Sequence, residues 1–349
     1  MPLITTTIGA YPKPAYIAVP DWFNIPAGPD TAAPTVGWAK AVAAMGDEAE
    51  AIFARGVKEV IDDQVGAGID IPTDGEVRRE NYIHYHCRHL AGIDFEILTE
   101  KTVRGVYTAK LPTVTGPVSA RDPFLPHDWR VAQGRTDRPV KITLPGPMTI
   151  TDTVADAHYG DPVRLGQALA AALNAEVLAL AAAGCRHIQI DEPVFARQPD
   201  NALAYGFENL ERAFHGAPAG VVRTVHMCCG YPDRLDHPDY PKAPQDSYGR
   251  IAAAIEDSSI MAVSIEDAHR HNDLALLEAF KTTSVILGVV AIAKSRVEPV
   301  EEIRARLDAA LAHIDAERLM AAPDCGLGLL GRGLALEKLR NLGLAAHSI

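Results

Sequence analysis

Short runs rich in β-branched residues recur along the whole chain, and most of them are separated by segments with helical patterns. Most of these runs are continuously apolar rather than alternating, which is typical of parallel strands that are covered on both faces. A strand followed by a helix, repeated to a total of eight strands, predicts an α/β protein with a single (β/α)8 TIM barrel. The predicted strands are residues 3–8, 69–72, 140–144, 185–190, 221–227, 261–265, 285–290 and 319–322.

The segments between these runs carry helix signals. Asp161 followed by Pro162 is a favourable N-cap and first helical residue, and the Ala- and Leu-rich segment after them ends at Gly184, a residue type that often follows the last turn. An alternative, the doubly wound open sheet, requires a nucleotide-binding glycine motif. The one match, at 326–331, has too little chain after it to complete a strand–helix–strand unit. Further helices are predicted at 47–65, 247–256, 272–280, 299–314 and 334–342.

Two regions interrupt the alternation of strands and helices. Residues 11–46 are rich in Pro and Gly, and we predict that they form a loop across one end of the barrel. Residues 77–139, after the second strand, are much longer than a strand-to-helix connection needs. We therefore expect residues 1–349 to form one catalytic domain in which 77–139 is an inserted lid, with a β-hairpin around 103–115.

Composition excludes several classes of partner. The 349-residue chain carries a formal net charge of −12, which disfavours nucleic acid and anionic membrane surfaces as ligands. We see no apolar stretch near the roughly 20 residues needed to span a bilayer, and no signal-peptide pattern at the N-terminus. The five cysteines are too scattered for a disulfide framework. We expect a soluble cytoplasmic protein with reduced thiols. The sequence leaves open whether this protein forms a homo-oligomer.

Side chains able to bind a metal follow several predicted strands, whose C-terminal ends meet at one face of a barrel. His226 and Cys228 are two residues apart, so in a strand their side chains point the same way. Glu266 follows the next strand, and Cys325 comes two strands later. Two thiolates, an imidazole and a carboxylate make a suitable tetrahedral set for Zn²⁺. We predict a zinc site at these four residues, with Cys229 on the opposite face.

Four protein ligands are usual for a structural zinc, but this site would lie in the catalytic mouth of the barrel. We therefore expect one ligand to be exchanged for the thiol of a substrate, which would become a thiolate nucleophile at neutral pH. Glu266 is the only oxygen ligand of the predicted set, and it is the residue that we expect to be displaced.

Seven motifs resemble, in order, the catalytic C-terminal barrel of cobalamin-independent methionine synthase: IGAYPKP, TDGE, LPGPMTI, IQIDEP, HMCC, SIED and PDCGLG. The resemblance covers essentially the whole chain and implies a TIM barrel that binds homocysteine as a zinc thiolate. It implies zinc ligands at His226, Cys228, Glu266 and Cys325. By the same resemblance, Glu76 of TDGE and Asp191 of IQIDEP hold the ammonium group of homocysteine. The N-terminal barrel of the family enzyme has no counterpart, so we expect a stand-alone catalytic barrel.

Three positions depart from the family pattern. Ala10 replaces a serine that helps to hold the amino-acid carboxylate, and residues 147–153 lack the tryptophan that lies near the pterin. Lys294 replaces a histidine that protonates the leaving folate nitrogen. These departures favour an unusual methyl donor over standard methyltetrahydrofolate, and Lys294 is a third predicted catalytic residue beside Glu76 and Asp191.

The leading hypothesis is therefore a zinc-dependent S-methyltransferase that forms methionine from homocysteine and a small alkyl donor. The same superfamily includes single-barrel zinc enzymes that add coenzyme M to epoxides, and Lys294 could protonate an opening epoxide. Against this alternative, the two carboxylates Glu76 and Asp191 suit an ammonium better than a sulfonate. A third alternative is a thiol-binding or metal-storage barrel with a purely structural zinc.

Overall fold

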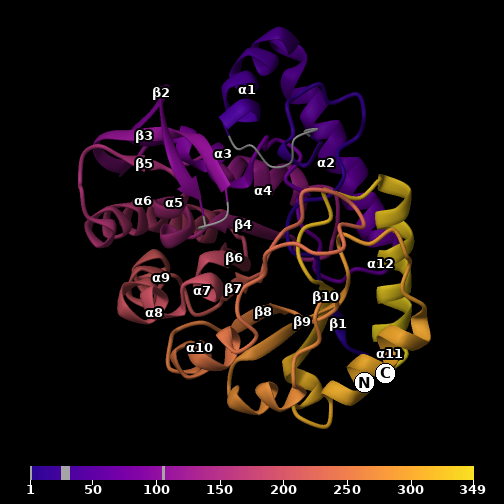
Figure 1. The fold of residues 1–349 in the computed structure, drawn as a ribbon. Helices are drawn as coiled ribbons and strands as arrows, with labels where there is room; N and C mark the ends of the chain where they lie inside the picture. The colour runs from indigo at the N-terminus through magenta and orange to yellow at the C-terminus, as the bar shows by residue number, and fades with distance from the viewer. Residues whose placement is uncertain (1, 25–31, 104–106) are drawn as a thin grey trace.

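The computed structural model describes residues 2–24, 32–103 and 107–349. Within them, seven parallel strands form one sheet in the order β1-β10-β9-β8-β7-β6-β4. The sheet curls into a half-barrel, and helices surround its outer side (Figure 1). The strands span Ile4–Thr5 (β1), Lys141–Pro145 (β4), His187–Asp191 (β6), Val222–Met227 (β7), Ala262–Glu266 (β8), Ser284–Val290 (β9) and Leu319–Pro323 (β10).

The strand predicted at 69–72 is not a regular strand. Thr6 and Ile71 form an isolated parallel bridge, and Thr73 and Lys141 form another, so this segment contacts both edge strands of the sheet. The backbone N–H of Ile71 donates to the Thr5 carbonyl at 3.0 Å, and that of Lys141 donates to the Pro72 carbonyl at 2.9 Å. Single bridges replace a continuous ladder, which explains why the prediction of a full strand is wrong here.

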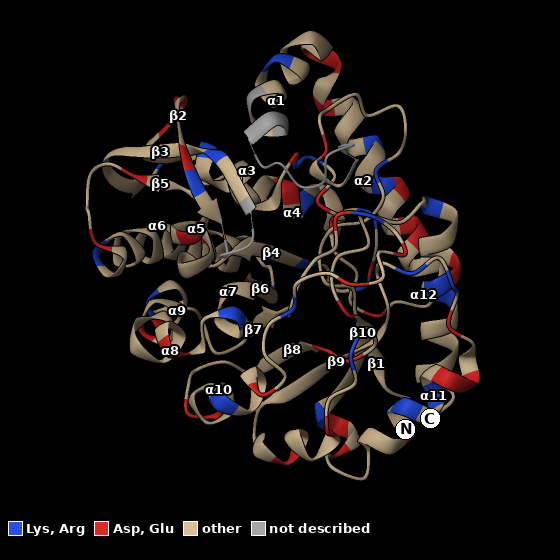
Figure 2. Cartoon of the chain, viewed as in Figure 1, with Lys and Arg blue, Asp and Glu red and all other residues tan. Residues whose placement is uncertain are grey.

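Most of the predicted helices are present. Helix α6 (Pro162–Ala183) begins as its caps predict, because the Asp161 carboxylate accepts the N–H groups of Val163 and Arg164, and Gly184 ends the helix with φ of 110°. The segment predicted at 272–280 is instead a 3-10 helix, η4 (Leu274–Ala279). Charged side chains lie on the peripheral helices and loops and on the hairpin strands β2 (Leu90–Val103) and β3 (Tyr107–Ala120), whereas the strands of the curled sheet carry few of them (Figure 2). The other predicted helices correspond to α2 (Ala49–Gly66), α10 (Ser247–Glu256), α11 (Val300–Ala310) and α12 (Arg332–His347).

Helix α6 is long and apolar enough, by length and composition alone, to cross a membrane. The expectation that no apolar stretch approaches such a length is therefore wrong. The helix lies against β3, α5 (Pro147–Thr153) and α9 (Phe207–Phe214), and one of its faces is buried. That face includes Leu165, Leu169, Leu173, Val177 and Leu180. Burial of this kind is typical of a core helix in a globular protein.

The long segment after residue 77 contains the predicted hairpin, but the hairpin is larger than expected. Strands β2 (Leu90–Val103) and β3 (Tyr107–Ala120) pair in antiparallel fashion, and the short β5 (Ala155–Asp156) completes a three-stranded sheet. Residues 104–106, between the two strands, lie outside the described residues. The hairpin packs beside α6, at one side of the curled sheet (Figure 1). It is flanked by α3 (Tyr82–Arg88) and α4 (Leu125–Gln133).

The prediction of a loop throughout 11–46 is wrong from residue 32. Helix α1 (Ala32–Met45) occupies the second half of this region, and its Ala-rich sequence provides the strongest helix-forming residue. A short 3-10 turn, η1 (Trp22–Asn24), lies in the first half. The part of the predicted loop at 25–31 lies outside the described residues.

Candidate metal centre and adjoining pocket

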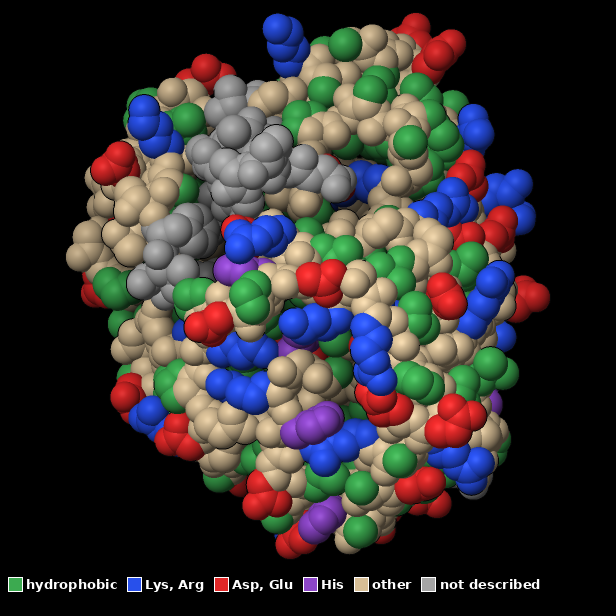
Figure 3. Space-filling model, turned by 45° about the vertical axis from the view of Figure 1, so that its right-hand side comes forward, with side chains coloured by type: hydrophobic (Ala, Val, Ile, Leu, Met, Phe, Trp, Pro, Cys, Tyr) green, Lys and Arg blue, Asp and Glu red, His purple; other side chains and the backbone are tan. Residues whose placement is uncertain are grey.

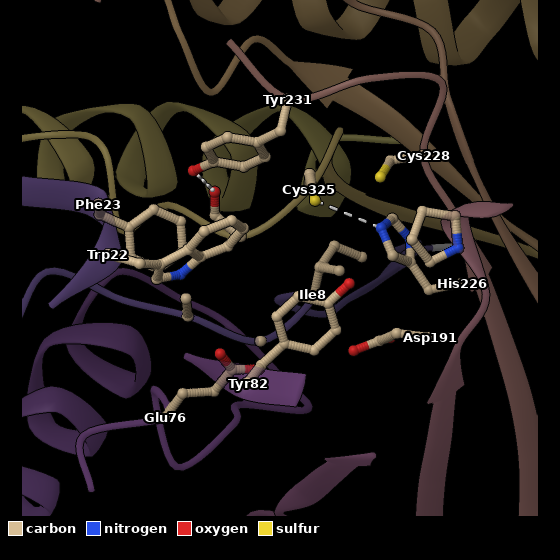
Figure 4. A pocket seen from close by; sticks show the side chains of 14 residues that line it. Ile8, Trp22, Phe23, Glu76, Tyr82, Asp191, His226, Cys228, Tyr231 and Cys325 are labelled. Carbon is tan, nitrogen blue, oxygen red and sulfur yellow. Dashed lines mark hydrogen bonds between the residues drawn. The ribbon is translucent and has the colours of Figure 1, made fainter. Parts of the chain in front are cut away.

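Three of the four predicted metal ligands converge at the C-terminal end of the sheet. His226 lies near the end of β7, Cys228 follows that strand, and Cys325 follows β10. The ligand atoms of these three residues all lie within 4.8 Å of one another. His226 Nε2 is 3.4 Å from Cys325 Sγ, and Cys228 lies beside them (Figure 4). This geometry could hold one metal ion.

The neighbouring strand fixes the orientation of the imidazole. β7 and β8 pair so that His226 lies opposite Ser264, and His226 Nδ1 is 2.9 Å from Ser264 Oγ. Metal-binding histidines commonly use one ring nitrogen for such a hydrogen bond and the other for the metal. Here the second nitrogen, Nε2, faces the sulfur of Cys325.

Glu266, the predicted fourth ligand, is not part of this cluster. It ends β8 and is buried, but its carboxylate oxygens lie outside the group of three ligand atoms, and it does not line the adjoining pocket. Burial raises the pKa of Glu266 well above its ordinary value, and the negative charge of Cys228 raises it further. Glu266 is therefore close to the cluster without being assembled into it.

The chemistry of the cluster fits zinc. Two effects raise the pKa of the Cys325 thiol well above its ordinary value. The larger is its hydrogen bond with Cys228, and the second is its burial. The Cys325 thiol and the Glu266 carboxyl therefore both ionise less readily beside Cys228. A divalent cation reverses this effect because it stabilises the thiolates, and two sulfurs with an imidazole are donors that zinc prefers.

A pocket of about 460 Å³, measured with its opening, adjoins the three clustered residues. Glu76 and Asp191, predicted to hold an ammonium group, line the same pocket. The sheet register explains why Asp191 lies near the clustered residues, because Asp191 at the end of β6 lies opposite His226 on β7. The remaining lining residues are Ile8, Gly9, Ala10, Trp22, Phe23, Tyr82, Pro193, Tyr231 and Gly326.

Glu76 is held in an unusual backbone conformation. Its φ is 54°, in the left-handed region that non-glycine residues seldom adopt and that often marks functional sites. Its Oε1 accepts a hydrogen bond from Thr143 Oγ1 at 2.9 Å and lies 3.5 Å from a guanidinium nitrogen of Arg79. Burial raises the pKa of Glu76, and the charge of Arg79 opposes that shift.

The pKa of the Asp191 carboxyl lies near neutral pH. Burial raises the pKa of its carboxyl to about 7, while the charge of His226 and the Gln189 amide act in the opposite direction. Gln189 Nε2 donates to Asp191 Oδ1 at 2.7 Å and fixes that oxygen. A cation entering the pocket would favour the carboxylate form.

Aromatic residues of the pocket were not predicted from the sequence. The ring centroids of Trp22 and Phe23 are 4.8 Å apart, and those of Phe23 and Tyr231 are 5.4 Å apart. Tyr231 donates its hydroxyl to the Gly326 carbonyl at 2.9 Å. Figure 4 shows the Trp22 and Phe23 rings on the side of the pocket away from His226 and Cys228. The adjacent Trp22-Phe23 pair in a Pro-rich segment was the signal that could have pointed to this wall.

The structure does not bring Lys294 to this pocket. Lys294 lines two outer hollows instead, one of them together with Lys242 and Arg270. The N–H of Ala293 donates to His269 Nε2 at 3.2 Å, which holds the segment that carries Lys294 against the buried ring of His269. The position of Lys294 does not support the predicted role as a proton donor.

Fold and pocket together define an α/β enzyme whose active site lies at the C-terminal ends of parallel strands. Residues 3–348 match the family described as "Cobalamin-independent synthase, Catalytic domain", and the chain belongs to this family. The resemblance identified from the sequence motifs is thereby confirmed.

Named relatives and solved structures agree with this assignment. The chain is 28% identical to a methionine synthase of Saccharolobus solfataricus, over 97% of this chain and 92% of the relative. It is 31% identical to a B12-independent methionine synthase from Shewanella sp. W3-18-1, solved in complex with selenomethionine, with a TM-score of 0.87 over 99% and 97% of the two chains. A putative vitamin-B12 independent methionine synthase from Listeria monocytogenes shares the fold at 18% identity, with a TM-score of 0.72 over 99% and 98%.

Proposed function

We propose that this chain is a zinc-dependent S-methyltransferase that forms methionine from homocysteine. One observation carries the proposal: His226, Cys228 and Cys325 bring three ligand atoms within 4.8 Å of one another, beside a pocket that Glu76 and Asp191 also line. The relatives that are named methionine synthase support homocysteine as the thiol.

His226, Cys228 and Cys325 would hold the zinc ion, and Glu266 would complete the set until the substrate thiol arrives. Bound zinc would lower the pKa of the substrate thiol, and the resulting thiolate is a nucleophile at neutral pH. Ser264 keeps the His226 ring in place through its 2.9 Å contact. The position of Glu266 outside the cluster supports it as the ligand that gives way.

Glu76 and Asp191 would orient the amino acid by binding its ammonium group. Both are buried carboxyls with raised pKa values, and a neighbouring cation would return each to its charged form. The hydrogen bonds from Thr143 and Gln189 fix one oxygen of each carboxyl, which leaves the other oxygen for the substrate. No Lys or Arg is present among the described lining residues, so the pocket suits an ammonium better than the sulfonate of coenzyme M.

We infer that the methyl donor is not standard methyltetrahydrofolate. Residues 147–153 contain no tryptophan, and Lys294, which replaces the histidine of the family pattern, lies outside the pocket. The aromatic wall formed by Trp22, Phe23 and Tyr231 offers an apolar surface to the group that carries the methyl.

We further propose that residues 1–349 form one domain, with the segment at 69–73 as the eighth strand of a closed barrel. Its parallel bridges to β1 and β4 support this closure. Residues 77–139 would be an insertion whose lid function rests on α3, because Tyr82 of α3 lines the pocket, whereas no described residue of the hairpin does. A zinc centre would require Cys228 and Cys325 to stay reduced, and the need for a reducing compartment supports a cytoplasmic location.

Calorimetric titration of the zinc-loaded protein with homocysteine, in buffers of different ionisation enthalpy, tests the proposal. We expect binding with release of a proton, because the thiol becomes a thiolate. A parallel titration with coenzyme M identifies the alternative alkyltransferase if that thiol binds instead. If neither thiol binds, the proposed reaction is wrong.

A further inference from the structure

A buried guanidinium group lies beside the carboxyl of Glu76. Arg79 is only 1% exposed, whereas Figure 3 shows many other Lys and Arg side chains at the molecular surface. The backbone N–H of Arg79 donates to the Glu76 carbonyl at 2.9 Å, and its Nη1 lies 3.5 Å from Glu76 Oε1. Removing a charge from water is costly, so a buried arginine needs partners that offset this cost.

The guanidinium determines the direction of a hydroxyl group that contacts Glu76. Arg79 Nη1 donates to the carbonyl oxygen of Thr143 at 3.0 Å and to its Oγ1 at 2.9 Å. A guanidinium can only donate hydrogen bonds, and a hydroxyl has a single proton to donate. The Thr143 proton is therefore left for Glu76 Oε1, at 2.9 Å. Because Thr143 belongs to β4, this contact ties Glu76 to the sheet.

The backbone after β1 closes another side of the same carboxylate oxygen. A Cβ atom on Gly9 would lie 2.6 Å from Glu76 Oε1, so the absence of a side chain at Gly9 leaves room for this oxygen. Gly9, Thr143 and Arg79 thus enclose Oε1. Glu76 lines the pocket, and Oε2 is the oxygen that remains for a ligand.

The charges around Glu76 favour a ligand that brings a positive charge. Asp74 and Glu76 are both buried, and Arg79 lies 3.5 Å from a carboxylate oxygen of each. Lys13 also acts on Glu76, but Lys13 has an ion-pair partner of its own at 2.7 Å. One guanidinium cannot neutralise two carboxylates, and Asp191 brings a further carboxyl to the pocket.

Arg79 also acts on the protonation of Glu76. Burial raises the pKa of the Glu76 carboxyl, and the charge of Arg79 is the largest of the effects that lower it. The charge of Asp74 raises this pKa further. Without the guanidinium, the Glu76 carboxyl would keep its proton to a higher pH, and a protonated carboxyl cannot form an ion pair with a cation.

We propose that Arg79 is a positioning residue for the binding of the substrate amino group. It directs the Thr143 hydroxyl to Glu76 Oε1 and supplies the positive charge that lets the buried Glu76 carboxylate accept an ammonium. Arg79 acts through Glu76, since Arg79 itself does not line the pocket. The assignment rests on the proposed function and deepens it by naming the group on which Glu76 depends.

Calorimetric titration of the zinc-loaded Arg79→Gln protein with homocysteine tests the assignment. We expect the affinity to be about tenfold or more below that of the parent protein at neutral pH. The ratio of the two affinities should shrink as the pH rises, because Glu76 of the variant then loses its proton. Arg88→Gln is the matched control, since Arg88 is a largely buried arginine that pairs with Glu80, and it should bind homocysteine like the parent.

A double variant separates this role from a general effect on the structure. If Arg79 acts through Glu76, adding Arg79→Gln to Glu76→Gln should cause no further loss of homocysteine affinity. Thr143 provides a second pair that keeps Arg79. Thr143→Val should weaken homocysteine binding about tenfold, whereas Thr143→Ser keeps the hydroxyl and should bind like the parent. Circular dichroism checks the folding of each variant, and the Thr143 pair tests the contact with Glu76 if Arg79→Gln does not fold.

An NMR titration of the protein with 13C-labelled glutamate tests Arg79 without any ligand. The Glu76 signal is the one missing from Glu76→Gln, and its pKa should be higher by about one pH unit or more in Arg79→Gln than in the parent. If the parent binds no homocysteine, the proposed function is wrong, and this titration still decides the role of Arg79. Equal Glu76 pKa values in the two proteins would overturn the assignment. So would a loss of homocysteine affinity that is the same at every pH and persists in the Glu76→Gln background.

Discussion

Cys325 allows the most direct test of the proposed metal centre at the scale of single residues. We expect Cys325→Ser to lower zinc affinity by more than about a hundredfold, since loss of an outer hydrogen-bond partner alone costs about 10- to 100-fold. Competition with a chelator measures the affinity. Cys185→Ser removes another buried thiol, away from the pocket, and should bind zinc like the parent protein. Equal affinities in the two variants would exclude Cys325 as a ligand.

Glu76→Gln tests the proposed ammonium contact. The variant keeps the shape of the side chain but loses its charge, so homocysteine affinity should fall about 10- to 100-fold while zinc affinity stays the same. Calorimetry measures the first quantity and chelator competition the second. Glu337→Gln, at an exposed position of α12, is the control. A fall in zinc affinity that matches the fall in homocysteine affinity would indicate a structural role for Glu76 instead.

The residues of the site were predictable to different degrees. His226 and Cys228 share one strand, and the two-residue period of a strand is visible in the sequence. The place of Cys325 followed from the order of the strands. Glu266 is the last residue of β8, and whether its carboxylate reaches the cluster depends on side-chain packing that no sequence period encodes. Lys294 lies in the loop after β9, and its side-chain direction depends on the geometry of that loop. Tyr231 reaches the pocket through such a loop, and it was missed.

At the scale of elements, the end of α6 gives a clear test. Gly184 has φ of 110°, which an alanine adopts only with strain, and a Cβ atom there would lie 3.2 Å from the Trp129 ring. We expect Gly184→Ala to lower the free energy of unfolding by about 1–2 kcal/mol. Urea unfolding measures this change.

Gly249→Ala is the matched control for this substitution. Gly249 lies in α10, it is exposed, and a Cβ atom there meets nothing within 4 Å. Alanine should therefore raise the free energy of unfolding by about 0.5–1 kcal/mol. If both variants change stability in the same direction, the conformation of Gly184 is not what ends α6.

The elements that were predicted well are those whose signals are local. The caps of α6 and the apolar run of β9 needed no knowledge of their partners. The sequence at 69–72 predicts a strand, but whether it forms a continuous ladder depends on how closely the two edge strands approach it. The length of the hairpin formed by β2 and β3 likewise depends on packing against α6 and on the added β5.

At the scale of the whole molecule, Lys141 links the stability of the fold to pH. It begins β4, bridges to Thr73, and is 2% exposed. Burial lowers the pKa of its amine from the ordinary 10.5 to about 7, although the charge of Asp191 opposes the shift. The unfolded chain keeps this proton up to about pH 10.5, whereas the folded protein keeps it only up to about pH 7. Stability should therefore rise with pH across this window.

Lys141→Met should remove this dependence. We expect the variant to exceed the parent protein in stability by about 1–3 kcal/mol at pH 7, and the gain should shrink toward pH 10. Urea unfolding at several pH values measures the difference, and Lys281→Met at an exposed position serves as the control. A gain that is the same at every pH would show that the Lys141 amine is not the titrating group.

The register of the sheet also limits how such a chain can change over generations. Asp191 lies opposite His226, and His226 opposite Ser264. A one-residue insertion in β7 would turn Met227 and Cys229 toward the pocket in place of His226 and Cys228. Selection can therefore keep the three ligand atoms together only by preserving this register. The loops after the strands can change in length and sequence, so descendants with the same strands can come to bind different molecules in the pocket.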